Sequence, residues 1–266
     1  MPSIVWSIAA SASSGLWMDE RINDDRFLVD AAAGLALVVD ASGPTYGGYH
    51  APFAIDPGVA SFIETFTAGH GPTRERLVSA VRAAHAVMRA MYEDYEAQRA
   101  GRVGLEAARK ATDAVRPQAW KDYEALAHFM GSLTACAVGP DAVVVAQVGE
   151  CRAYSLRDQV PALLVPDHTL PSVLEASGAS REEVEQARRD HSSVVVALLG
   201  SETLHMNVVE IAAPTTIALV TNGVWQCNAE LEEAFRMQTR DDLSRLVLRC
   251  SKAARDDATA VVFTVS

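Results

Sequence analysis

The sequence predicts an α+β fold in which two packed β-sheets carry helical layers on their outer sides. The first observation is the order of the patterned segments: strands, two long helical stretches, more strands, two helices and a final strand. This order differs from the strand–helix alternation that builds a doubly wound parallel sheet. The second observation is that 266 residues with 49% hydrophobic content are ample for one large core. We therefore expect a single domain over residues 1–266.

Charge and cysteine content narrow the range of functions. The formal net charge of −11 argues against binding to nucleic acid or an anionic membrane through an overall positive field, whereas acidic sites attract metal ions. The four cysteines lie far apart and lack the spacing of zinc ligands. Cys136 and Cys151 sit in apolar runs and are expected to be buried free thiols. The N-terminus does not read as a signal peptide and no apolar run is long enough for a membrane span, so we expect a cytoplasmic location.

Three strands are predicted near the start of the chain, each as a short apolar run. They lie at Ile4–Ala10, from Phe27 onward, and at Leu35–Val39. Asp24 and Asp25 precede the second strand, and Asp40 ends the third. If the second and third strands pair as antiparallel neighbours, these three carboxylates lie together. The alternative is that each acid only initiates a turn.

Helices are predicted in the middle of the chain and near its end. Apolar residues recur every three or four positions over Thr73–Ala100, beyond which glycines are expected to end the helix. A second helical region is expected over Leu105–Gly131, interrupted near Pro117. Two later helices are expected to begin near Ala229 and Asp241.

The second half of the chain is richer in predicted strands. These are 133–138, 142–148, 152–156, 194–198, 216–221 and 259–265. The first three are expected to form a meander, with one of its turns at Gly149 and Glu150. The polar stretch Pro171–Ser193 is a candidate mobile flap with one short helix, which Ser180 and Glu183 would begin as a capping box.

Polar residues stand at the ends of several predicted strands. They are Asp24, Asp25, Asp40, Glu150, Asn222, Asp256 and Asp257. Carboxylates that crowd together take up protons unless cations neutralise them, and Mg²⁺ and Mn²⁺ prefer oxygen ligands. Two such ions can bind a phosphate ester and lower the pKa of water. If these residues converge, they favour a metal-assisted hydrolytic site; if they do not, they are solvated turn residues.

Several sequence segments, taken in order, resemble the metal-dependent protein phosphatase family (PPM, protein phosphatase 2C type), especially its compact bacterial members. The most specific segment is VAQVGECRAYSLRD, which is similar to the family's VANVGDSRAYLLRDG. The others include NDDRFLV, which resembles NEDxFLV, VVDASG, which stands in place of VxDGMGG, IALVTNGVW, which stands in place of LLLCSDGLW, and RDDATAVVF, which stands in place of xDNxTAVVV. The resemblance covers nearly the whole chain.

The resemblance implies a four-layer αββα sandwich of two antiparallel sheets flanked by helix pairs. It also implies two Mg²⁺ or Mn²⁺ ions between the sheets, with a third weak site, and hydrolysis of phosphoserine or phosphothreonine by a metal-bound hydroxide. The metal ligands that it implies are Asp24, Asp40, the carbonyl of Ala41, Glu150, Asn222 and Asp256. Asp25 would order a water molecule, and Arg21 would bind phosphate. The implied partners are phosphorylated proteins, with a serine/threonine kinase or the targets of that kinase.

Some positions depart from the family pattern. Asn222 replaces an Asp, and Asp24 replaces a longer Glu. Ala41 replaces a Gly and would be strained if that position required positive φ. Arg21 is one place away from the family's phosphate-binding Arg, whose position Glu20 holds. These changes keep a second function open: a pseudophosphatase that binds a phosphoprotein or another partner as a regulatory module.

Overall fold

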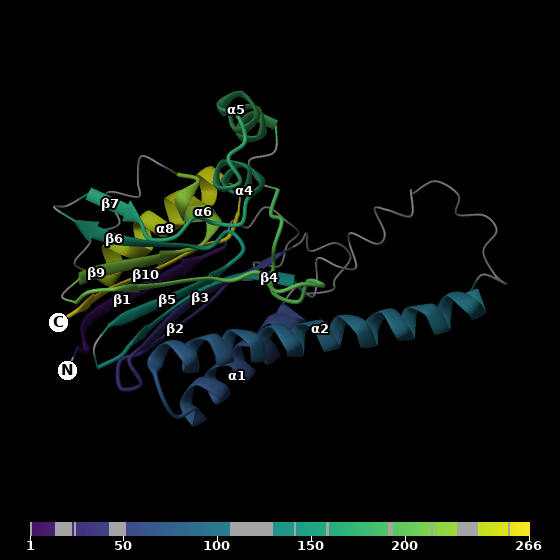
Figure 1. Cartoon of the computed structure of the whole chain (residues 1–266), viewed down its shortest axis with the longest axis horizontal. Helices are drawn as coiled ribbons and strands as arrows, with labels where there is room; N and C mark the ends of the chain where they lie inside the picture. The colour runs from purple at the N-terminus through teal and green to yellow at the C-terminus, as the bar shows by residue number, and fades with distance from the viewer. Residues whose placement is uncertain are drawn as a thin grey trace.

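Two antiparallel sheets stacked face to face form the centre of this computed structural model (Figure 1). The structure describes residues 2–13, 23, 25–42, 52–106, 130–140, 142–157, 160–190, 194–213, 215–227, 239–254 and 256–266. One sheet has the order β1 (Ile4–Ala12), β10 (Ala258–Val265), β9 (Thr215–Val220), β6 (Arg152–Arg157) and β7 (Val160–Leu163). The other has the order β2 (Arg26–Asp30), β3 (Leu35–Ser42), β4 (Met130–Val138), β5 (Val143–Val148) and β8 (Asn207–Ile211).

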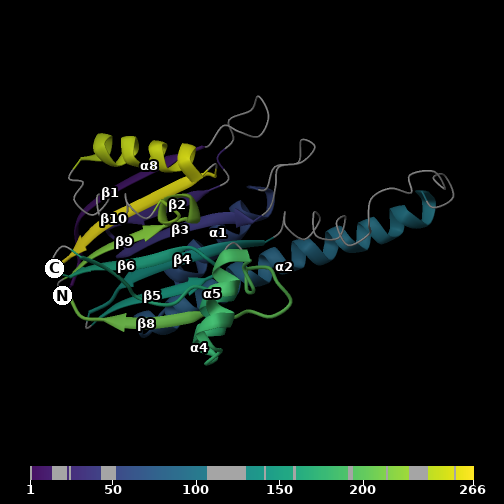
Figure 2. The same ribbon diagram turned by 90° about the horizontal axis from the view of Figure 1, so that it is seen from above.

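Helices cover the outer faces of both sheets (Figure 2). The β2-containing sheet packs against α1 (Pro52–Ala68) and α2 (Thr73–Glu106). The β1-containing sheet packs against α6 (Asn222–Trp225) and α8 (Arg240–Ala254). Two further helices, α4 (Leu170–Ala176) and α5 (Arg181–Asp190), contact each other outside these layers. The described residues thus confirm the predicted α+β sandwich, and none of their helices is both long and apolar enough to cross a bilayer.

Three apolar layers hold the sandwich together because strand side chains alternate between the two faces. In β3, Leu35, Leu37 and Val39 contribute to the layer under α1 and α2, while Ala36 and Val38 contribute to the layer between the sheets. Other residues of the inter-sheet layer come from both sheets and include Cys136, Val145, Cys151, Ala153, Ile217, Leu219, Val261 and Phe263. Cys136 and Cys151 are buried free thiols, as predicted.

The predicted meander over residues 133–156 is wrong in one respect that matters for the site. Strands β4 and β5 pair with each other, but β6 pairs with β9 and β7 in the opposite sheet. The turn at Gly149 and Glu150 therefore crosses from one sheet to the other. Gly149 adopts φ +82°, a conformation that glycine reaches without strain.

Other segment boundaries also differ from the prediction. Helix α2 continues through both of its glycines to Glu106, since an interior glycine costs only about 1 kcal/mol. Met130 and Gly131 begin β4, where a helical region was expected to end; the rest of that region, 107–129, lies outside the described residues. The segment 194–198 is not a sheet strand but forms isolated bridges, which join Thr169 to Val195 and Gly131 to Leu199.

Some elements had no counterpart in the prediction: α1, α4, α6, β7 and β8. The capping box that begins α5 is confirmed, because the Ser180 N–H donates to Glu183 Oε2 at 2.8 Å. Helix α8 begins at Arg240, one residue before the predicted Asp241. The helix predicted near Ala229 falls outside the described residues.

Candidate active site

One end of the layer between the sheets is polar. Asp40 continues the inward-facing row of Ala36 and Val38 along β3, so its side chain is directed toward the opposite sheet. In the opposite sheet, Thr221 continues the inward-facing row of β9, and Thr259 belongs to the inward-facing row of β10; both residues are fully buried. The side-chain alternation of the strands, which builds the apolar layer, thus also directs polar side chains into the end of that layer.

Asp25 lies beside Asp40 because β2 and β3 pair as antiparallel neighbours, as predicted. The register places Arg26 opposite Val39, so the residue before Arg26 is next to the residue after Val39. The Asp25 N–H donates to Asn23 Oδ1 at 2.8 Å, which fixes the approach to β2. Asp24 is outside the described residues, as is Arg21.

The carboxylate of Asp25 is buried and only partly satisfied. Thr221 Oγ1 donates to Asp25 Oδ2 at 2.8 Å, whereas Asp25 Oδ1 is buried without a hydrogen-bond partner among the described residues. Burial raises the pKa of Asp25 to about 7, and the charges of Asp257 and Asp256 add to this shift, against the lowering effect of hydrogen bonds from Thr259 and Thr221. Without a nearby cation, this carboxyl group is therefore partly protonated near neutral pH.

Asp40 lies within the electrostatic influence of several other acids at this end. Burial raises its pKa well above the ordinary value, and four other carboxylates raise it further through their charges. In decreasing order of effect these are Asp25, Glu150, Asp256 and Asp257. These acids come from distant parts of the sequence, and they lie close enough for their charges to affect one another.

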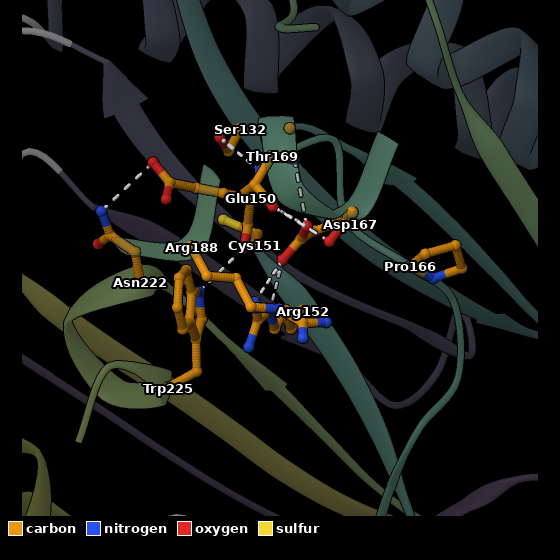
Figure 3. Close-up of polar contacts among 12 residues, drawn as sticks. Ser132, Glu150, Cys151, Arg152, Pro166, Asp167, Thr169, Arg188, Asn222 and Trp225 are labelled. Atoms are coloured by element: carbon orange, nitrogen blue, oxygen red, sulfur yellow. Dashed lines mark hydrogen bonds and ion pairs between the residues drawn. The ribbon is translucent and has the colours of Figure 1, made fainter. Parts of the chain in front are cut away.

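Glu150 lies in the turn that crosses between the sheets, and Figure 3 shows its contacts with neighbouring residues. Its N–H donates to Ser132 Oγ at 3.0 Å, and its carbonyl accepts a hydrogen bond from Trp225 Nε1 at 2.9 Å. A Cβ on Gly149 would overlap Ser132, with its Cα at 2.8 Å, so only glycine allows this close approach. The turn is therefore held by β4 on one side and by α6 on the other.

Buried polar side chains hold the remaining backbone of the same turn. His168 Nδ1 accepts from the Gly149 N–H at 3.0 Å, and Gln147 Nε2 donates to the Gly149 carbonyl at 2.6 Å. The Cys151 carbonyl accepts from Thr134 Oγ1 at 2.7 Å. Nearly every backbone group around Glu150 has a defined partner, which fixes the direction from which its carboxylate enters the site.

Asn222, at the start of α6, lies beside Glu150. Its Nδ2 donates to Glu150 Oε1 at 3.4 Å, while Asn222 Oδ1 and Glu150 Oε2 are buried without hydrogen-bond partners among the described residues (Figure 3). Burial raises the pKa of Glu150 to about 7, and the charges of Asp256 and Asp167 contribute to this. The pKa of Asp256 is also raised, chiefly by burial.

A buried ion pair supports the Glu150 turn from behind. Arg152 Nε donates to Asp167 Oδ2 at 2.7 Å, and the Asp167 side chain is fully buried. The guanidinium lies over the Trp225 ring at 3.6 Å from its centroid, and that same indole holds the Glu150 carbonyl. Thr169 Oγ1 completes the arrangement by donating to Asp167 Oδ1 at 2.6 Å.

The chemistry of these side chains fits a hard divalent cation. All the candidate donors are oxygens, and three buried oxygens, on Asp25, Glu150 and Asn222, lack hydrogen-bond partners within the part of the chain that the structure describes. As they stand, however, no three His, Cys, Asp or Glu side chains of the described residues lie together as a group that could hold one ion. The residues therefore supply the right kind of ligand without forming a closed ligand set.

Ala41 and several supporting residues complete the comparison with the sequence prediction. Ala41 lies within β3 opposite Gly131, in extended strand conformation, so the strain considered for it does not arise. The prediction missed several groups that position the acids: Ser132, Thr221, Trp225 and Thr259. The sequence did contain one signal for such residues: a polar residue that continues the inward-facing apolar residues of a strand marks the end of a buried layer.

Two stacked antiparallel sheets, outer helices and acids at one end of the inter-sheet layer define a four-layer α+β sandwich with a polar end. This is the fold of the PPM serine/threonine phosphatases. The PPM phosphatase MsPP from Mycobacterium smegmatis, solved with cacodylate, is 18% identical with a TM-score of 0.69, covering 98% of this chain and 99% of that chain. The Mycobacterium tuberculosis phosphatase PstP/Ppp is 20% identical with a TM-score of 0.67, covering 98% of both chains.

A third solved structure carries metal ions. The catalytic domain of PstP in complex with two manganese ions is 18% identical to this chain, with a TM-score of 0.66, and the match covers 100% of this chain and 99% of that one. No protein-family model matches the sequence, and no curated protein matches it. The likeness therefore lies in the fold.

Proposed function

We propose that this chain is a divergent Mg²⁺- or Mn²⁺-dependent serine/threonine protein phosphatase. The observation that carries the proposal is the proximity of Asp25, Asp40, Glu150 and Asp256 at the end of the inter-sheet layer, with buried oxygens that have no hydrogen-bond partner among the described residues. The fold supports it, since similar structures are PPM phosphatases and one holds two manganese ions. Phosphorylated proteins would be the substrates, with a cognate kinase or its targets as further partners, and the location would be cytoplasmic.

The proposal assigns the residues as follows. Asp40 would contact both ions. The carbonyl of Ala41, together with Asp256 and Asn222, would hold one of them, and Asp24 would hold the other. Glu150 would serve a third, weaker site. Bound ions would offset the negative charge of the phosphate ester and lower the pKa of a water molecule. Asp25, held by Thr221, would orient water through Oδ1, the oxygen without a hydrogen-bond partner. Arg21 would bind the phosphate.

The experiment is hydrolysis of p-nitrophenyl phosphate by the purified chain, with Mn²⁺ and with EDTA, beside Asp40→Ala. The proposal expects turnover that needs Mn²⁺ and is lost in Asp40→Ala. Absence of turnover across millimolar Mn²⁺ would reject the enzyme, and turnover that survives in Asp40→Ala would reject the assigned site.

A pseudophosphatase is the second candidate, and a specific observation favours it. The described acids do not form a closed ligand set, and Asn222 offers an uncharged ligand where a carboxylate would bind a cation more strongly. Such a protein would bind a phosphothreonine peptide without releasing phosphate. Equilibrium binding of that peptide, measured alongside phosphate release, separates the two candidates.

A further inference from the structure

A closed ring of hydrogen bonds leads from the backbone N–H of Asp25 back to the carboxylate of the same residue. The Asp25 N–H donates to Asn23 Oδ1 at 2.8 Å, and Asn23 Nδ2 donates to Ser11 Oγ at 2.6 Å. Ser11 Oγ and Thr259 Oγ1 are hydrogen-bonded to each other at 2.5 Å. The Thr259 N–H donates to Thr221 Oγ1 at 2.9 Å, and Thr221 Oγ1 donates to Asp25 Oδ2 at 2.8 Å. We call this set of five residues the Asp25 ring.

The Asp25 ring joins the two sheets at the polar end of the layer between them. Asn23 and Asp25 lie at the entry to β2 in one sheet. Ser11 of β1, Thr259 of β10 and Thr221 at the end of β9 belong to the other. The buried half consists of Asp25, Thr221 and Thr259, whereas Ser11 is exposed and Asn23 half-buried. A surface hydroxyl group on β1 is thus connected to a buried acid that enters the opposite sheet.

The directions of these bonds decide which oxygen of Asp25 is free. Thr221 has one hydroxyl proton and donates it to Asp25 Oδ2, while its oxygen accepts the Thr259 N–H. Asp25 Oδ1 is left as the oxygen without a hydrogen-bond partner among the described residues. At the other end of the ring, the Asp25 N–H requires an oxygen, so Asn23 turns Oδ1 toward it and Nδ2 toward Ser11. The ring therefore holds Asp25 by its backbone and by its carboxylate at once.

We propose that Ser11 and Asn23 are positioning residues, which direct Asp25 Oδ1 into the candidate active site through the outer half of the ring. The inference rests on the proposed function for the water molecule that Oδ1 would orient, but the ring itself is a property of the metal-free chain. Linked hydrogen bonds strengthen one another, so the loss of an outer bond loosens the inner ones. An exposed serine would otherwise have little influence on a buried carboxylate.

The test uses four variants of the full chain. Ser11→Ala removes the hydroxyl group, and Ser11→Thr retains it. Asn23→Ser keeps an oxygen that can accept the N–H two residues later but removes the Nδ2 donor. The matched control is Thr264→Val, which breaks a hydroxyl pair of the same kind, Thr216 Oγ1 to Thr264 Oγ1 at 3.1 Å, between β9 and β10.

The first measurement is hydrogen exchange of the Asp25 amide, followed by NMR in EDTA. We expect this amide to exchange about tenfold faster or more in Ser11→Ala and in Asn23→Ser, because both break the link between Asn23 and Ser11. Ser11→Thr and Thr264→Val should match the unsubstituted chain. The double variant should exchange no faster than Asn23→Ser alone, since one link cannot be broken twice. An unchanged rate in Ser11→Ala, or additive increases in the double variant, rejects the ring.

A second amide shows whether the change is local. The Ala33 N–H donates to Asp30 Oδ1 at 2.9 Å, so it is also held by a carbonyl-type oxygen of a side chain, at the far end of β2. Its exchange rate should be the same in all variants. If Ser11→Ala accelerates both amides equally, the hydroxyl group supports the whole strand, and the positioning role is rejected.

The second measurement is Mn²⁺-dependent hydrolysis of p-nitrophenyl phosphate. Ser11→Ala should lower kcat about tenfold with KM little changed, because the ring orients an acid without contacting the substrate. Ser11→Thr should restore kcat, and Thr264→Val should leave it unchanged. A chain in which no variant releases phosphate, but in which the Asp25 amide responds as expected, retains the ring and loses the proposed function. A chain that hydrolyses phosphate esters with equal kcat in Ser11→Ala retains the function and loses the positioning role.

Discussion

The imidazole Nδ1 of His168 accepts a hydrogen bond from the Gly149 N–H at 3.0 Å, and the His168 N–H donates to the Gly149 carbonyl at 2.9 Å. This reciprocal pair ties the segment that leads into α4 to the turn that presents Glu150. Because Nδ1 is the acceptor, the neutral ring carries its proton on Nε2. Burial, with a smaller effect from the charge of His205, lowers the pKa of His168 and favours this neutral form.

The first prediction concerns this acceptor. His168→Leu should destabilise the chain by about 1–3 kcal/mol, because it leaves the buried Gly149 N–H unpaired. His168→Asn should retain much of the stability, since its amide oxygen can accept at the position of Nδ1. Urea denaturation of both variants measures the difference. Equal stability of the two variants would show that the acceptor does not hold the turn.

The second prediction concerns the pH dependence of the metal-free chain. The folded pKa values of Asp25 and Glu150 are about 7, above their ordinary values near 4, so the folded state binds more protons than the unfolded state between these limits. In EDTA, the free energy of unfolding should therefore rise as pH falls from 8 to about 6.5. Below that, the lowered pKa of His168 acts in the opposite direction, because its protonation favours the unfolded state.

Denaturation in EDTA at a series of pH values measures this slope, and Asp25→Asn is the control. Removing one titrating carboxyl group should flatten the slope, and excess Mn²⁺ should reduce it, since a bound cation favours the charged carboxylates. A free energy of unfolding that falls between pH 8 and 6.5 in EDTA would contradict the account of the buried acids.

The third prediction concerns the ion pair behind the site. Asp167→Asn should cost about 3 kcal/mol, because Asp167 is fully buried and its loss leaves the Arg152 guanidinium without its counter-charge. The matched control is Arg74→Gln, which breaks the Arg74–Glu210 pair, whose side chains are both about half exposed. That change should cost less than about 1 kcal/mol. If chemical denaturation gives equal losses in the free energy of unfolding for both variants, Asp167 does not support the Glu150 turn.

The fourth prediction separates backbone strain from crowding at the turn. Gly149→Ala and Gly178→Ala both place a side chain at positive φ, +82° and +79°. Backbone strain should lower the free energy of unfolding of each variant by about 1–2 kcal/mol. Gly178 has open space around its Cβ position, whereas a Cβ on Gly149 would overlap Ser132. Gly149→Ala should therefore lose clearly more stability than Gly178→Ala and should also weaken Mn²⁺ binding. Similar losses in both variants would mean that Ser132 moves aside freely.

The apolar pattern of the strands and their antiparallel pairing explain why much of the site could be predicted. Asp25 and Asp40 follow directly from two adjacent apolar strands, because antiparallel neighbours bring the start of one strand to the end of the other. Periodicity also identified the beginning of α2. Glu150 and Asn222 were identified in the same way, as polar residues at strand ends, and the resemblance to a family added their implied role as metal ligands.

The parts that could not be predicted depend on tertiary contacts. That β5 and β6 belong to different sheets is decided by the pairing of β6 with β9, which no local pattern encodes. Helix α1 was missed because Pro57 lies inside it and the expected helical signal is interrupted. The supporting partners of Glu150, such as Trp225 and His168, come from chain segments that meet only in the folded protein. Asp24, an implied metal ligand, and Arg21, the implied phosphate-binding residue, lie outside the described residues.

The central claim is that the carboxylates at the end of the inter-sheet layer form a metal-dependent hydrolytic site. Phosphate release from a phosphothreonine peptide, followed across a range of Mn²⁺ concentrations for the unsubstituted chain and for Asp40→Asn, tests it most directly. The account predicts release that saturates with Mn²⁺, disappears in EDTA and falls about 100-fold or more in Asp40→Asn. Release that is absent at every Mn²⁺ concentration, or equal in Asp40→Asn, would contradict it.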